Sequence, residues 1–170
     1  MSMAIEFKLN ECKAVEVVLW LIQKGETSMY HIFKMLFEAE KYHLNKYERP
    51  ITGDTYMAME HGTVPKWIYT DACKKSNMDF VRSGKRLYAK RPPITNMLSE
   101  SDIEALEIGY KKYAGFDFSG VRDINHKEPA WQKNWNKRGI LKCVDIPFED
   151  IVENDFLRED LKETARLTVI

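Results

Sequence analysis

The residue types that could do metal or acid–base chemistry are spread along the chain rather than clustered. Of the four histidines, His31 and His43 are twelve positions apart, whereas two metal ligands on one helix face are about four positions apart. His61 and His126 lie in other segments, and nothing in the sequence brings them together. Because a zinc site needs about three or four converging ligands, this spacing favours a protein with no metal and no cofactor.

A hydrolytic site made of His126, Glu128 and Asp54 is the enzyme hypothesis that the residue types allow. Acid–base catalysis by paired carboxylates needs a fixed separation and split pKa values, and the sequence indicates neither. Helix capping by Asp54 and surface charge for Glu128 are the simpler interpretation. The chain also lacks the motifs GxSxG, GxxxxGKS/T and GxGxxG, which mark an activated serine or a phosphate-binding loop. We therefore predict that the protein is not an enzyme.

A basic cluster is made up of Lys85, Arg86, Lys90 and Arg91. Such a cluster binds nucleic acid or an acidic protein in some molecules. In others, lysines on an edge strand prevent unwanted strand pairing. We favour the second interpretation, a charged hairpin edge.

Three tryptophans are large anchors of the kind found both in cores and at binding hot spots. Trp131 and Trp135 lie in a helix-like pattern, and we assign Trp131 to the core. Trp67 follows a predicted loop, so the sequence leaves open whether it packs inside or faces a partner.

Composition and charge indicate an ordinary globular chain of one domain, residues 1–170, with 44% hydrophobic and 31% charged residues. The 26 basic residues are balanced by 26 acidic ones, which disfavours nucleic acid as a partner. Cys12, Cys73 and Cys143 form no CxxC pair, which favours a reducing cytoplasm. We expect no signal peptide and no membrane contact, because the longest apolar run, residues 17–22, is too short to cross a bilayer.

Apolar residues at helical spacing predict helices over residues 11–24 and 29–45. Gly25 suits the end of the first helix, and Ser28 is suited to cap the start of the second. Ser99 and Asp102 form a capping-box pattern that opens another helix. Further helices are predicted over about 65–75 and 119–125, from Pro129 onward, and in the tail.

Residues 79–82 and 85–90 flank a turn at Ser83 and Gly84, which predicts a β-hairpin that must pack on the helices. Residues 49–54 contain Pro50 and Gly53 and predict an ordered turn. We expect residues 55–60 to be either extended or a loop, and residues 61–65 to be a loop. The predicted fold class is mainly α within α+β: a compact helical domain with a small β-hairpin.

Five short blocks, in order, carry a resemblance to a known family: KMLFEAEKYHL at 34–44, RPITGDTY at 49–56, GTVP at 62–65, LSESD at 98–102 and HKEPAW at 126–131. Together they resemble the signature of the Panacea domain, the SocA-like antitoxin or phage-associated protein family. The resemblance covers about residues 14–135, followed by a C-terminal helical extension over 145–170. Glu48 stands where this family commonly has Gly.

The resemblance implies a prokaryotic antitoxin of a toxin–antitoxin system, which neutralises a cognate toxin by protein–protein binding. The toxin is expected from an adjacent gene. In some relatives the family member instead delivers the toxin to an ATP-dependent protease, and the sequence does not choose between these mechanisms. A DNA-binding regulator of its own operon is a further alternative, although no helix-turn-helix is evident. Whether the chain forms homo-oligomers is left open.

The residues predicted to contact the partner come from the signature turn, the following helix and the hairpin. Binding residues concentrate in loops, and the polar residues of the turn at 49–54 lie in a predicted loop. The predicted contact set consists of Thr52, Asp54, Tyr56, Trp67, Arg86 and Tyr88.

Overall fold

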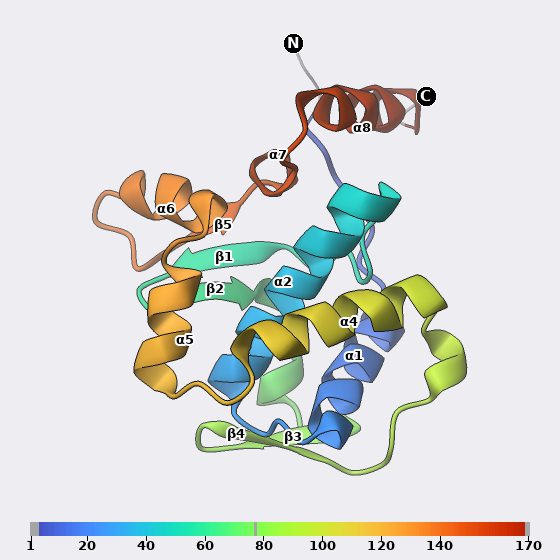
Figure 1. The fold of residues 1–170 in the computed structure, drawn as a ribbon, viewed down its shortest axis with the longest axis vertical. Coiled ribbons are helices and arrows are strands. Elements are labelled where there is room, and N and C mark those ends of the chain that lie inside the picture. Colours follow the sequence, from blue (N-terminus) through green and yellow to red (C-terminus); the bar gives the residue numbers. More distant parts are fainter. Residues whose placement is uncertain (1–3, 77, 169–170) are drawn as a thin grey trace.

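The fold is built around one long central helix. The computed structural model describes residues 4–76 and 78–168, and in it α2 (Met29–Tyr47) lies against α4 (Glu100–Tyr113), with α1 (Glu11–Lys24) beside both (Figure 1). Side chains of α2 such as Ile32, Met35 and Phe37 are completely buried or nearly so. The central position of α2 explains why its apolar stripe is so wide.

The axes of α2 and α4 approach closely at Gly109. A Cβ atom at this position would lie 2.2 Å from the carbonyl oxygen of Met35 and 3.3 Å from the backbone nitrogen of Ala39. Gly109 is therefore required by the close backbone contact, since real Cβ atoms do not approach an oxygen this closely.

The predicted capping residues Gly25, Ser28 and Ser99 are confirmed, although α2 extends two residues beyond its predicted end at residue 45. The Ser28 hydroxyl accepts a hydrogen bond from the His31 backbone N–H, and Gly25 ends α1 with a φ of 117°. Ser99 and Asp102 form a complete capping box at the start of α4. At the end of α2, Glu48 has a φ of 62°, a left-handed conformation that favours glycine. This conformation accounts for the glycine that is common at this position in the resembled family.

Two small antiparallel sheets complete the fold and confirm the predicted α+β class. The hairpin of β3 (Phe80–Ser83) and β4 (Arg86–Ala89) was predicted. The second sheet was not: its strand order is β2-β1-β5, formed by Gly62–Pro65, Tyr56–Met59 and Cys143–Ile146. Residues 62–65 are therefore a strand and not the predicted loop.

The remaining elements differ from the predictions mainly at their boundaries. The helix predicted over 65–75 is split into α3 (Lys66–Thr70) and a 3₁₀ helix (Ala72–Lys74), and another 3₁₀ turn covers Thr95–Met97. The predicted C-terminal extension starts within β5 and continues as α7 (Phe148–Ile151) and α8 (Asp155–Thr168). Between them and α4 lie α5 (Phe118–Asn125) and α6 (Pro129–Asn136). Within residues 4–76 and 78–168, no helix is long and apolar enough to cross a membrane.

Replacing Gly109 with alanine should destabilise the protein by about 1–3 kcal/mol, because the added methyl group forces α4 away from α2. Helix propensity alone predicts the opposite sign, a gain of about 1 kcal/mol. Urea denaturation of Gly109→Ala beside Lys111→Ala, an exposed site on the same helix, measures the difference. A Gly109→Ala variant that is as stable as the wild type would contradict the close contact.

Candidate functional site

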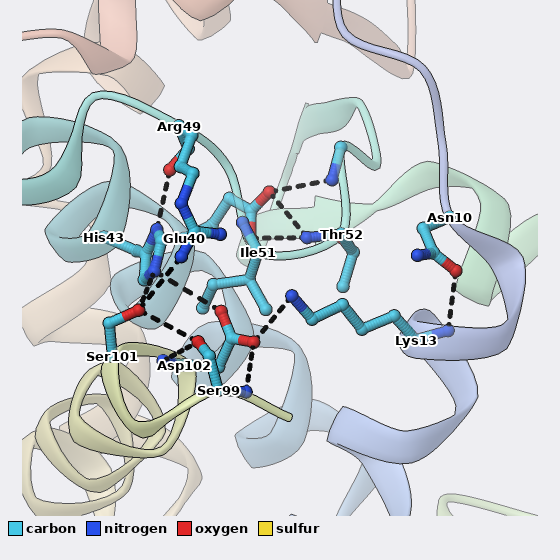
Figure 2. Close-up of polar contacts among 11 residues, drawn as sticks. Asn10, Lys13, Glu40, His43, Arg49, Ile51, Thr52, Ser99, Ser101 and Asp102 are labelled. Carbon is cyan, nitrogen blue, oxygen red and sulfur yellow. Dashed lines mark hydrogen bonds and ion pairs between the residues drawn. The ribbon is translucent and has the colours of Figure 1, made fainter. Parts of the chain in front are cut away.

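The turn at residues 49–54, part of the family signature, is held in place by a buried carboxylate. Both oxygens of Glu40, on α2, accept hydrogen bonds from backbone N–H groups of Ile51 (3.1 Å), Thr52 (3.3 Å) and Gly53 (3.0 Å), as Figure 2 shows. Burial raises the pKa of Glu40 to about 7, although these three bonds favour its ionised form. Residues 49–54 are thus an ordered turn, as predicted.

A second polar group lies beside it and joins three helices. Lys13 Nζ of α1 is 2.6 Å from Asp102 Oδ2, and His43 of α2 lies 3.3 Å from Asp102 Oδ1 and 2.9 Å from Ser101 Oγ (Figure 2). Burial would raise the pKa of Asp102, but its bonds with Lys13 and with the Ser99 backbone outweigh burial and lower the pKa. Burial lowers the pKa of His43, which favours its neutral form.

This cluster contains serine, histidine and aspartate, but its geometry is not that of a catalytic triad. Ser101 and Asp102 both contact Nε2 of His43, whereas Nδ1 donates to the Arg49 carbonyl oxygen at 2.6 Å. A triad needs the serine and the carboxylate on opposite ring nitrogens. His43 and Asp102 are also fully buried, so the cluster joins α1, α2 and α4 and has no access to a substrate.

Asp54 caps a helix, in agreement with the simpler of its two interpretations. Its carboxylate accepts hydrogen bonds from the backbone N–H groups of Trp67 (2.9 Å) and Ile68 (3.2 Å) in the first turn of α3. Burial raises the pKa of Asp54 to about 6. Asp54 lies at the end of the turn, and its two hydrogen bonds join the turn to the start of α3.

Three of the six predicted contact residues are in the interior. The exposed fractions of Thr52, Asp54 and Tyr56 are 5%, 2% and 2%. Their polar groups satisfy the turn and α3, and Tyr56 packs edge-on against Phe37. Because these side chains are buried, a partner cannot reach them in this conformation. Their polar groups form hydrogen bonds within the protein instead of being exposed.

The other three predicted contact residues remain at the surface. Trp67 is half-buried beside a shallow depression, and Tyr88 is 48% exposed. Arg86 is exposed and donates to the Thr27 hydroxyl. In the basic cluster, Arg91 pairs with Glu16 and Asp79. These internal contacts are those expected of a charged hairpin edge.

An open groove of about 680 Å³ lies elsewhere on the molecule, between the first half of α2, the turn that joins β1 to β2, and the loop after α6. Its lining is mostly apolar and aromatic, as is typical of binding sites. The lining residues are Met29, Tyr30, Phe33, Lys34, Met59, Glu60, His61, Val64, Tyr69, Trp135, Arg138, Gly139, Ile140, Leu141 and Lys142.

The β1–β2 turn at the edge of this groove is fixed by side chains from other elements. Trp131 Nε1 donates to the carbonyl oxygen of Met59 at 2.8 Å, and His126 Nε2 donates to that of Glu60 at 3.0 Å. The Tyr30 hydroxyl donates to the carbonyl oxygen of His61 at 2.7 Å. Trp131 is 7% exposed, which places it in the core as predicted. The groove therefore has a preformed wall.

The opposite side of the groove exposes apolar side chains on a loop. Ile140 is 101% exposed and Leu141 is 58% exposed, between α6 and β5. Exposed neighbouring aliphatic residues on a groove are typical of an interaction surface. Neither residue is among the six predicted contact residues. The signal that could have identified them is an aliphatic pair within the polar segment 136–142.

Lys34 lies inside the groove wall. Its exposed fraction is 1%, and its Nζ atom is 4.1 Å from the centroid of the Tyr30 ring. Burial lowers the pKa of Lys34 to about 7. Gly62 leaves room for the stem of this side chain, because a Cβ atom at Gly62 would lie 2.9 Å from Lys34 Cε and 2.1 Å from Asn125 Oδ1.

The residues of the enzyme hypothesis are engaged in separate contacts. Glu128 pairs with Lys41 at 2.8 Å, His126 stacks on Trp131, and Asp54 caps α3. In the described part of the chain, no hydrogen bond or ion pair joins any two of His126, Glu128 and Asp54, nor do three or more His, Cys, Asp or Glu residues group so as to hold a metal.

Comparison with known proteins identifies the family. A family model described as antitoxin SocA-like, Panacea domain, matches residues 32–132, and the chain belongs to this family. Searches of curated proteins and of solved structures found no significant match. The family supports an antitoxin-type role, with a toxin as the general class of partner.

Replacing Glu40 with glutamine should destabilise the protein by about 1–3 kcal/mol at neutral pH, because an amide NH₂ would face backbone N–H donors. Below a pH of about 7 the cost should grow, on the order of 1 kcal/mol for each pH unit down to about 5. The reason is that Glu40 has a raised pKa in the folded wild type and binds a proton at a higher pH there than in the unfolded chain. Protonation therefore stabilises the folded wild type as the pH falls, whereas glutamine does not titrate.

Urea denaturation between about pH 5 and pH 8 measures both effects. Glu48→Gln is the matched control, because Glu48 is exposed at the end of the same helix and should change stability by less than about 0.5 kcal/mol. A pH-independent difference between wild type and Glu40→Gln would show that Glu40 is already ionised throughout this range.

Proposed function

We propose that this protein neutralises a cognate toxin by direct, stoichiometric binding and that the groove is the surface that binds. The observation that carries the proposal is that signature residues of an antitoxin family line the groove or shape its wall. Lys34 lines the groove, while Gly62 and Trp131, from two other blocks of that signature, shape the β1–β2 turn that lines it.

The mechanism that fits such a surface is occlusion. The groove offers an apolar, aromatic centre with polar groups at its rim, the usual arrangement of a protein–protein interface. Burying Ile140 and Leu141 against a partner would contribute about 1.5–3 kcal/mol each. The exposed hairpin residues Arg86 and Tyr88 extend the surface, since the Met29 backbone N–H at the groove edge bonds to the hairpin at Lys85.

The setting we propose is the cytoplasm of a prokaryotic cell, with the toxin encoded by an adjacent gene. The protein would act as a binding protein and not as an enzyme. Delivery of the bound toxin to an ATP-dependent protease remains the alternative outcome of the same binding step, and the experiment below separates the two.

Expression of the adjacent open reading frame in a bacterial host should arrest growth, and co-expression of this protein should restore it. Restoration that persists in a host lacking ATP-dependent proteases indicates occlusion, whereas restoration that disappears there indicates delivery. A neighbouring product that is harmless with or without this protein would contradict the proposed function for this gene pair.

The groove itself is tested by Ile140→Ser, with Phe156→Ser as the matched control. Both side chains are highly exposed, at 101% and 85%, so neither change should affect folding, and Phe156 lies on α8 outside the groove. Calorimetric titration with the toxin should show a dissociation constant at least about tenfold higher for Ile140→Ser and unchanged for Phe156→Ser. Equal effects of the two substitutions would place the interface elsewhere.

A further inference from the structure

We infer that the groove receives an acidic side chain of the partner protein, whose carboxylate pairs with Lys34 Nζ while flanking apolar residues pack on Ile140 and Leu141. This inference rests on the proposed function and adds the chemistry of the partner segment: a glutamate or aspartate between aliphatic residues.

The first observation is that Lys34 lacks an anionic partner. In residues 4–76 and 78–168, no acceptor hydrogen-bonds to Lys34 Nζ and no carboxylate lies within ion-pair distance of it, although the side chain is 99% buried. Its contact is the face of the Tyr30 ring at 4.1 Å. A ring face attracts a cation but leaves its N–H donors unused.

Other poorly exposed lysines of this chain are treated differently. Lys13 pairs with Asp102 at 2.6 Å. Lys41, two turns along α2 from Lys34, pairs with both Glu128 (2.8 Å) and Glu153 (2.9 Å). Lys13 and Lys41 thus each have a carboxylate partner within the protein. Lys34 has none in the described residues, so a carboxylate of the partner protein could take that position.

The second observation is the position of the unpaired amine. Lys34 belongs to the lining of the groove, and the absence of a side chain at Gly62 leaves room for its Cε atom beside the β1–β2 turn. The lysine is therefore part of the wall of an open groove of about 680 Å³ and not of a closed core. Desolvation lowers its pKa to about 7, which a paired carboxylate would reverse. An arriving carboxylate would thus gain an ion pair in a site from which water is already largely excluded.

The third observation is the charge of the surrounding groove. Arg138 and Lys142 on the loop after α6 are cationic, and Glu60 is the single carboxylate in the lining. Arg138 is stacked on Trp135 at 3.7 Å, which fixes its position at the rim. The titratable or charged groups that face the groove are Tyr30, Lys34, Glu60, His61, Tyr69, Arg138 and Lys142. This balance complements an acidic segment and would repel a basic one.

The first test uses a probe that does not depend on the toxin. The capped pentapeptide ALELA and its glutamine counterpart ALQLA are titrated to millimolar concentrations into isotopically labelled protein, and backbone resonances of the groove are followed by NMR. We expect ALELA to cause saturable shifts at Gly62 and Lys142 of the wild type, and ALQLA to bind at least about tenfold more weakly. Lys34→Met should bind both peptides equally. Equal binding of both peptides to the wild type, or no saturable shift with ALELA, overturns the inference.

The second test uses the toxin and a matched pair of variants, Lys34→Met and Lys111→Met. Methionine has a similar shape to lysine and removes a buried unpaired charge, so Lys34→Met should unfold at the same or a higher urea concentration than the wild type. Its affinity for the toxin should nevertheless fall by about 30-fold or more. Lys111 is exposed on α4 outside the groove, and Lys111→Met should bind as the wild type does.

Two outcomes separate the acidic-segment inference from the proposed function. If the wild type neutralises the toxin and Lys34→Met binds it equally well, the acidic-segment inference is wrong while the proposed function stands. If the wild type fails to neutralise the toxin but still prefers ALELA over ALQLA through Lys34, the proposed function falls and the carboxylate site stands.

Discussion

The structure depends on one buried carboxylate that organises a turn. Glu40 lies on the central helix and gathers the backbone N–H groups of Ile51, Thr52 and Gly53, so the chain leaving α2 is folded back over the helix. This turn sets the start of β1, and Asp54 at its end orients α3 through the backbone of Trp67 and Ile68. A carboxylate in the interior is costly unless donors satisfy it, and the turn supplies those donors.

The family signature serves two separate regions of the molecule. Glu40, His43 and the residues of the 49–54 and 98–102 blocks form the buried polar clusters that hold the three main helices together. Lys34 lines the groove, and Gly62 and the 126–131 block shape the β1–β2 turn beside it. α2 contributes to both regions: Glu40 bonds to the turn, and Lys34 lies next to Gly62 at the start of β2. The same short segments thus stabilise the core and shape the groove.

The elements that could be predicted from the sequence are those that depend on interactions between neighbouring residues. The helix ends at Gly25, Ser28 and Ser99 follow from capping chemistry, and the β3–β4 hairpin follows from its turn. The β2-β1-β5 sheet was missed because β5 pairs with a strand far away in the sequence, and four-residue strands show little periodicity. The site was harder still. Thr52 and Asp54 have polar side chains that are buried, whereas Ile140 is exposed although it is apolar, so residue type alone predicts the exposure of neither.

The pairing of β5 with β1 has a consequence for how the chain folds. β1 can form its hairpin with β2 as soon as both are synthesised, but its other edge stays unpaired until Cys143–Ile146 arrives. Contacts of such long sequence separation slow folding and leave a nascent strand edge open to other chains. The same closing step tethers the second end of the loop that carries Ile140. The groove is therefore among the last parts of the protein to be completed, and a ribosome-bound chain would have a helical core before it has a groove.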